Sequence, residues 1–230
     1  MPESPLQEAG APASRTIRLA EAICLACVIT AAFAILPQWL LQIVRRHALA
    51  RGILGDQPWM SWAFAGFQLA IGLVLALSAP IRSGVRIGTL RPHWWKVLAL
   101  CVLSFVPVAV VYPLLPVHPF AAQHFTVWLV CPLAEDLTFI GYLYGLLGAA
   151  APAYVHRRLR IRWALVLTAV FFSLHHFTNY QIWPASYVNL QLAYSFVGLL
   201  VIGLTRQWTG SILYATFCHT GINLIAWLVP

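Results

Sequence analysis

Seven apolar runs, separated by short polar connections, follow one another along the chain. A helix needs about 20 apolar residues to cross the hydrocarbon core of a bilayer. The runs cover residues 20–44, 59–79, 94–115, 122–149, 161–178, 187–205 and 211–229. Pro37 interrupts the first run, and Pro107 predicts a kink in the third. The pattern predicts an all-α membrane protein, a bundle of about seven transmembrane helices.

Composition supports a membrane protein and leaves no room for a soluble domain of any size. Of the 230 residues, 61% are hydrophobic and 9% are charged, whereas soluble domains carry about 25% charged residues. We expect a disordered N-terminal tail over residues 1–18, N-terminal transmembrane helices over 19–118 and a helical core over 119–230. The five cysteines lie in apolar runs and are interpreted as small buried hydrophobes.

The net charge of +8 comes from basic residues grouped between the apolar runs. This grouping favours contact with anionic membrane lipids, and it offers no basic face for nucleic acid. Lys and Arg gather in the connections 80–96 and 151–162, which the positive-inside rule puts in the cytoplasm, with the C-terminus outside. The arginines within 45–57 run against this orientation.

Ionisable residues inside the predicted spans lie mainly in the C-terminal half. Glu135 and Asp136 are adjacent in the fourth span, where an ionised acid costs about 2.5–3.5 kcal/mol. Two such acids need partners, a water-filled cavity or protonation. We expect no Lys or Arg inside helices four to seven, which leaves His175, His176 and His219 as candidate partners.

These residues predict one polar, water-accessible pocket among helices four, five and seven. Asn223 follows His219 by four residues and shares its helix face. Neighbouring helix positions point about 100° apart, so the adjacent histidines cannot both face one point, and neither can the adjacent acids. A carboxylate beside an imidazole can activate water, and a second imidazole with an amide can stabilise an oxyanion. The residue types therefore support peptide hydrolysis inside the membrane.

Other readings of the same residues stay open at this point. Intramembrane acids also mark proton or ion pathways, so a transporter is an alternative. A lone His or Asn in a membrane helix often only bonds a neighbouring helix.

Three polar segments stand in order on separate predicted helices: EDLTFIG at 135–141, FSLHHF at 172–177 and GSILYATFCHTGINL at 210–224. They resemble the motifs EExxxRG, FxxxH and HxxxN or HxxxD of the CPBP family, the CAAX-processing and bacteriocin-processing intramembrane proteases, also called the ABI family. The second motif aligns as Phe172 to His176, and the resemblance covers about residues 120–230.

The resemblance implies an intramembrane endopeptidase and a role for each motif residue. Glu135 and His176 would activate water, and His219 and Asn223 would stabilise the oxyanion. The family has been read both as zinc metalloproteases and as metal-free glutamic proteases, and Glu135, His176 and His219 could be three zinc ligands. Resemblance to the Ras-converting CAAX endopeptidase branch implies the glutamic type, for which no cofactor is expected.

The chain departs from the family pattern at two positions. Asp136 stands for the second Glu, and Ile140 stands for the Arg. In the family these positions are four apart on a helix, a spacing that suits an acid–Arg pair. We hypothesise that His175 takes the place of the Arg as the partner of Asp136. The alternative is an inactive member that acts as a membrane immunity or binding protein, or as a transporter-like scaffold.

The resemblance also suggests a substrate class and a location. Bacterial members mature bacteriocins, give self-immunity or resemble proteases that trim C-terminal anchor tails of exported proteins. The orientation places the pocket toward the extracytoplasmic side. We therefore expect a membrane-anchored or exported protein substrate, cut near its C-terminal tail, in the bacterial inner membrane.

Overall fold

Every regular element that the computed structural model describes is a helix. The described residues are 12–50, 58–79, 84–85, 94–111, 127–151, 154–155, 161–181 and 183–228. The helices are α1 (Pro12–Ala50), α2 (Pro58–Ser78), α4 (Trp94–Val111), α5 (Val127–Asp136), η2 (Leu137–Leu143), α6 (Tyr144–Ala150), α7 (Trp163–His175), η3 (His176–Gln181), α8 (Ala185–Thr209) and α9 (Ile212–Leu228). Because α5, η2 and α6 run on without a break and η3 prolongs α7, the described chain forms the seven rods that the apolar runs predict.

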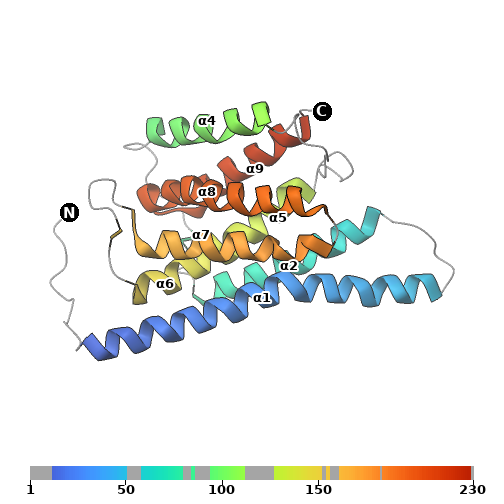
Figure 1. The fold of residues 1–230 in the computed structure, drawn as a ribbon, viewed down its shortest axis with the longest axis horizontal. Coiled ribbons are helices and arrows are strands. Elements are labelled where there is room, and N and C mark those ends of the chain that lie inside the picture. The colour runs from blue at the N-terminus through green and yellow to red at the C-terminus, as the bar shows by residue number, and fades with distance from the viewer. Residues whose placement is uncertain are drawn as a thin grey trace.

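The rods lie side by side in one helical bundle (Figure 1). The first rod, α1, and the third, α4, lie along opposite edges of this bundle. The rods that carry the sequence motifs (α5 with η2, α7 and α9) lie between them and contact one another. The all-α fold is confirmed, and it brings the polar segments of the C-terminal half to the inside.

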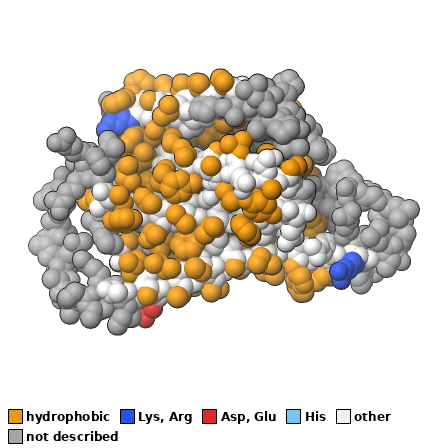
Figure 2. Space-filling model, viewed as in Figure 1, with side chains coloured by type: hydrophobic (Ala, Val, Ile, Leu, Met, Phe, Trp, Pro, Cys, Tyr) orange, Lys and Arg blue, Asp and Glu red, His pale blue; other side chains and the backbone are white. Residues whose placement is uncertain are grey.

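The outer surface of the bundle is apolar, as a membrane protein requires. In Figure 2 hydrophobic side chains cover most of the visible face, and the few charged side chains lie at its edges. Large apolar residues point outward, among them Leu77, 76% exposed, and Phe217, 74% exposed. Within the described residues, three helices are long and apolar enough to cross a bilayer: Arg18–Val44, Leu129–Ala150 and Ala185–Thr209. The chain is therefore an integral membrane protein.

The first helix is longer than the apolar run that predicts it. It begins at Pro12, within the predicted tail, while residues 1–11 lie outside the described residues. It continues through Pro37 to Ala50, and its 39 residues span about 58 Å at 1.5 Å per residue. The hydrocarbon core of a bilayer is about 30 Å thick, so α1 is longer than one crossing needs. Most of the basic connections used for orientation lie outside the described residues.

Close helix contact fixes the position of the acidic motif. Gly72 of α2 packs on the end of α5, where a Cβ at this position would lie 2.9 Å from the carbonyl oxygen of Ala134. Glu135 is the next residue, so the approach of α2 helps to set where the first motif lies.

The cysteines differ from their interpretation as small buried hydrophobes. Cys101 of α4 and Cys218 of α9 are buried, but a disulfide joins them, with their Cα atoms 5.4 Å apart. Cys24 and Cys27 are exposed, and Cys131 is partly exposed; these three carry free thiols. The apolar runs do not distinguish a lipid-facing position from a buried one, which is why the interpretation was wrong for Cys24 and Cys27.

Candidate active site

The two adjacent acids end α5, at the point where the helix widens. Asp136 is the last residue of α5 and is fully buried, and Glu135 before it is 13% exposed. The seven residues that follow form the π-helical turn η2. Such wide turns are rare and occur often at functional sites. The acids thus lie at a local change in helix geometry inside the bundle.

His219 of α9 lies between the two acids. Its Nδ1 is 3.0 Å from Asp136 Oδ1, and its Nε2 is 3.6 Å from Glu135 Oε2. Both acids therefore reach one ring, although neighbouring positions on a helix point in different directions. They do so because each contacts a different ring nitrogen.

His175, at the end of α7, approaches Glu135 from the other side. Its Nε2 lies 3.4 Å from Glu135 Oε1, and its Nδ1 lies 2.5 Å from the carbonyl oxygen of Phe172. A carbonyl oxygen can only accept a hydrogen bond, so Nδ1–H is the donor. The proton on Nδ1 leaves Nε2 to face the acid.

His176 does not take the place beside Glu135 that the motif alignment gives it. Within the part of the chain that the structure describes, no ion pair joins His176 to Glu135. Its ring lies 3.8 Å from that of His175, centroid to centroid, and its Nδ1 is 3.3 Å from Gln191 Nε2. Asn179 donates from Nδ2 to Gln191 Oε1 at 2.8 Å. His176 therefore belongs, with Gln191 and Asn179, to a polar group at the end of α7, next to His175.

The FxxxH spacing is met twice, which is why the alignment could select the neighbouring ring. Phe172 precedes His176 by four residues, and Phe171 precedes His175 by four. The α-helix ends at His175 and a 3₁₀ turn begins at His176, so the chain changes twist between the two rings. The geometry brings His175, not His176, to Glu135.

The structure does not form the pair expected between His175 and Asp136. Asp136 contacts His219, and His175 contacts Glu135. No Lys or Arg lies within the predicted sixth run, 187–205, but α8 continues beyond this run to Thr209 and buries an arginine there. Arg206, in the last turn of α8, is 7% exposed. It follows the end of the apolar run directly, a position that is typical of a residue at the membrane surface.

Asn223 lies one turn after His219 on α9 and is partly exposed. The structure gives it no hydrogen bond to another described side chain. It therefore remains next to the site, on the same helix as His219, with its amide available.

The first helix covers the imidazoles, although it lies outside the three motifs. Phe33 of α1 lies 5.8 Å from the ring of His175 and 5.4 Å from that of Phe139, centroid to centroid. Gln38, also on α1, donates from Nε2 to Thr178 Oγ1 of η3 at 2.9 Å. These contacts hold α1 against the end of α7 where the histidines lie.

Among the described residues, no three His, Cys, Asp or Glu side chains are arranged to hold a metal ion. The Nε2 atoms of His175 and His219 instead face separate oxygens of Glu135.

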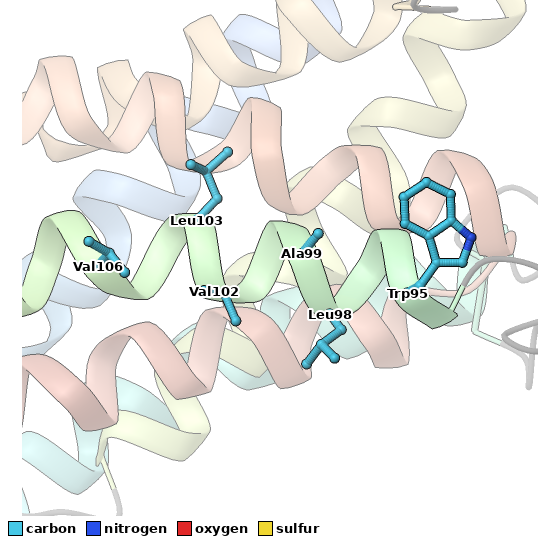
Figure 3. Close-up of a pocket in the computed structure, with 6 residues that line it drawn as sticks. All are labelled: Trp95, Leu98, Ala99, Val102, Leu103 and Val106. Carbon is cyan, nitrogen blue, oxygen red and sulfur yellow. The ribbon is translucent and has the colours of Figure 1, made fainter.

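A shallow pocket lies away from these residues, along α4 (Figure 3). None of its lining residues carries a titratable side chain, so it offers no acid–base chemistry. They are Trp95, Leu98, Ala99, Val102, Leu103 and Val106.

Comparison with known proteins supports the motif assignment. The family model described as "Type II CAAX prenyl endopeptidase Rce1-like" matches residues 116–225. No curated protein and no solved structure matches the chain. The matched segment contains Glu135, His175 and His219, the residues that the structure brings together. Residues 116–225 are therefore similar to the CAAX-type intramembrane endopeptidases of the CPBP family.

Proposed function

We propose that this chain is an active intramembrane endopeptidase of the glutamic type. The observation that carries the proposal is the position of Glu135 between two imidazoles. Its Oε1 faces His175 Nε2 at 3.4 Å, and its Oε2 faces His219 Nε2 at 3.6 Å. A carboxylate held beside imidazole nitrogens inside an apolar bundle can act as a general base toward water.

In the proposed reaction, Glu135 takes a proton from water while the water oxygen attacks the scissile carbonyl carbon. His175 assists: its Nδ1–H is bound to the Phe172 carbonyl, so its Nε2 is free to accept a hydrogen bond from the proton that Glu135 takes from water. His219 Nε2–H and the Asn223 amide donate to the oxyanion. The C–N bond then breaks, and the leaving amine takes the proton removed from water. The other product is a new C-terminal carboxylate.

Asp136 acts in this proposal as a positioning residue. It accepts a hydrogen bond from His219 Nδ1 at 3.0 Å and is fully buried. It therefore holds the imidazole with Nε2 toward Glu135 and balances a positive charge on the ring. This gives the shorter acid of the first motif a defined task without an Arg partner.

The proposed substrate is a membrane-anchored or exported protein, cut near its C-terminal tail in the bacterial inner membrane. The matched family description refers to prenyl CAAX tails. The basic connections favour a site that opens toward the extracytoplasmic side. That side suits an exported protein better than a prenylated cytoplasmic tail.

The experiment compares protein termini in cells that carry the wild type or Glu135→Gln at native expression. N-terminal and C-terminal proteomics of membrane and secreted fractions should reveal a set of proteins with uncut tails in the variant only. Glu21→Gln, at an exposed acid of α1, is the matched control and should behave as wild type. Identical termini in all strains, with the variant folded and present in the membrane, would contradict the proposal.

A second arm of the experiment tests the glutamic type. Purified wild type treated with 1,10-phenanthroline should keep its cleavage rate on a substrate found by the proteomics. Loss of the rate, restored by added zinc, would contradict the glutamic assignment while leaving the peptidase assignment intact.

A non-enzymatic binding protein is the second candidate. The observation that favours it is Ile140, which is 1% exposed at the position of the family Arg. A binding protein should keep its function in Glu135→Gln. A proton-coupled transporter should lose function in Glu135→Gln and tolerate Asn223→Ala, whereas a peptidase should be impaired by both.

A further inference from the structure

Arg206 is an arginine buried inside the bundle, away from the acids and histidines. It lies in the last turn of α8 and is 7% exposed. Charged side chains within membrane bundles are rare because their burial is costly, and they mark functional positions. The contacts of Arg206 therefore indicate its role in the protein.

The guanidinium of Arg206 binds the backbone of the first motif. Its Nη1 donates to the carbonyl oxygen of Gly141 at 2.9 Å, and its central carbon lies 4.6 Å from the centre of the Tyr144 ring. Gly141 belongs to η2, and Tyr144 is the first residue of α6. Arg206 thus holds the junction at which the π-helical turn returns to an α-helix.

The same guanidinium packs against a second segment. Gly84 has φ +67°, and a Cβ there would lie 2.9 Å from Arg206 Nε. The carbonyl oxygen of Gly84 accepts a hydrogen bond from the backbone N–H of Ile212 at 3.1 Å. Ile212 is the first residue of α9, the helix that carries His219. Arg206 therefore lies between η2, which follows the acids, and the segment that holds the start of α9.

The site of this contact coincides with the departure from the family motif. Ile140 stands at the position of the motif Arg, and the guanidinium from α8 binds the carbonyl of the next residue, Gly141. A cation is thus present at the first motif, but it comes from another helix and binds backbone.

We propose that Arg206 is a positioning residue for the endopeptidase reaction, a proposal that rests on the proposed function. By fixing the end of η2 it keeps Glu135 and Asp136 in contact with His175 and His219. A misplacement of about 1 Å in a catalytic group can lower the rate about 100-fold. Loss of the anchor should therefore act on the chemical step more than on substrate binding.

The test measures hydrogen–deuterium exchange and cleavage in Arg206→Met and Arg206→Lys, purified in detergent. In Arg206→Met, backbone amides of residues 137–144 should exchange at least tenfold faster, while those of α2 keep the wild-type rate. The kcat should fall about 100-fold with KM within a factor of about three. Arg206→Lys should recover part of both effects. Arg18→Met, at an exposed arginine of α1, should match the wild type.

The outcomes separate this proposal from the proposed function. Wild-type exchange at 137–144 in Arg206→Met, or a wild-type kcat in folded protein, overturns the positioning role. If Arg206→Met does not fold, Arg206→Lys decides: exchange and kcat equal to wild type overturn the role. If wild type itself cleaves nothing, the proposed function fails, while the exchange measurement still decides whether Arg206 anchors η2.

Discussion

At the residue scale, the proposed reaction depends on one carboxylate and two imidazoles. The sequence motifs predict Glu135 and His219, and the structure brings these two together. They do not decide between His175 and His176, because the FxxxH spacing fits both and the choice depends on where the α-helix of α7 becomes a 3₁₀ turn. They also miss Arg206, because an arginine directly after an apolar run is typical of the membrane surface.

The two histidines give a prediction in which each is the control for the other. His175→Phe should lower kcat/KM by 10²-fold or more, because it removes the nitrogen that faces Glu135. The ring that replaces it can still pack against Phe139 and Phe172, so the protein should remain folded. His176→Phe should cost less than tenfold. Peptidase assays on both purified variants decide the assignment, and the reverse order would restore the role of His176.

At the element scale, hydrophobic runs predict the rods but not their local geometry. The existence of seven helices follows from length and apolarity alone. The π-helical turn η2 has no signal in those runs, because it depends on how neighbouring helices and Arg206 hold the backbone of the fourth rod. The continuation of α1 through Pro37 was likewise not predicted, because Pro ordinarily interrupts a helix.

The contact between α2 and α5 gives a prediction about stability and activity together. Gly72→Ala should lower the free energy of unfolding by about 1–3 kcal/mol, because the new Cβ meets the backbone oxygen of Ala134. The displacement next to Glu135 should also reduce kcat. Gly66→Ala on the same helix meets nothing within 4 Å and should leave both unchanged. Thermal unfolding and peptidase assays test the pair; equal effects of the two substitutions would contradict the packing account.

At the scale of the whole molecule, the N-terminal helices are joined to the matched segment at several points. α1 covers His175 through Phe33, α2 approaches α5 at Gly72, and the disulfide ties α4 to α9 beside His219. Apolar runs cannot predict such contacts, because hydropathy alone does not show which helix faces pack against each other and which face lipid.

The disulfide between α4 and α9 determines which cysteines can react with a thiol reagent. In denatured, unreduced protein, a maleimide reagent should modify the three thiols of Cys24, Cys27 and Cys131. After reduction it should modify all five cysteines of the chain. Mass spectrometry of the labelled protein counts the additions. Five additions without reduction would show that α4 and α9 are not covalently joined.

The contact between Phe33 and the ring of His175 has a consequence for how such chains diverge. Substitutions at lipid-facing positions of an N-terminal helix cost little stability when one apolar residue replaces another. Substitution of Phe33 or Gln38 would expose the His175 ring or remove a hydrogen bond that holds the end of α7. Descendants of this chain that keep its activity should therefore retain an aromatic residue at the position of Phe33 and an amide at that of Gln38, even where the rest of the α1 sequence has diverged.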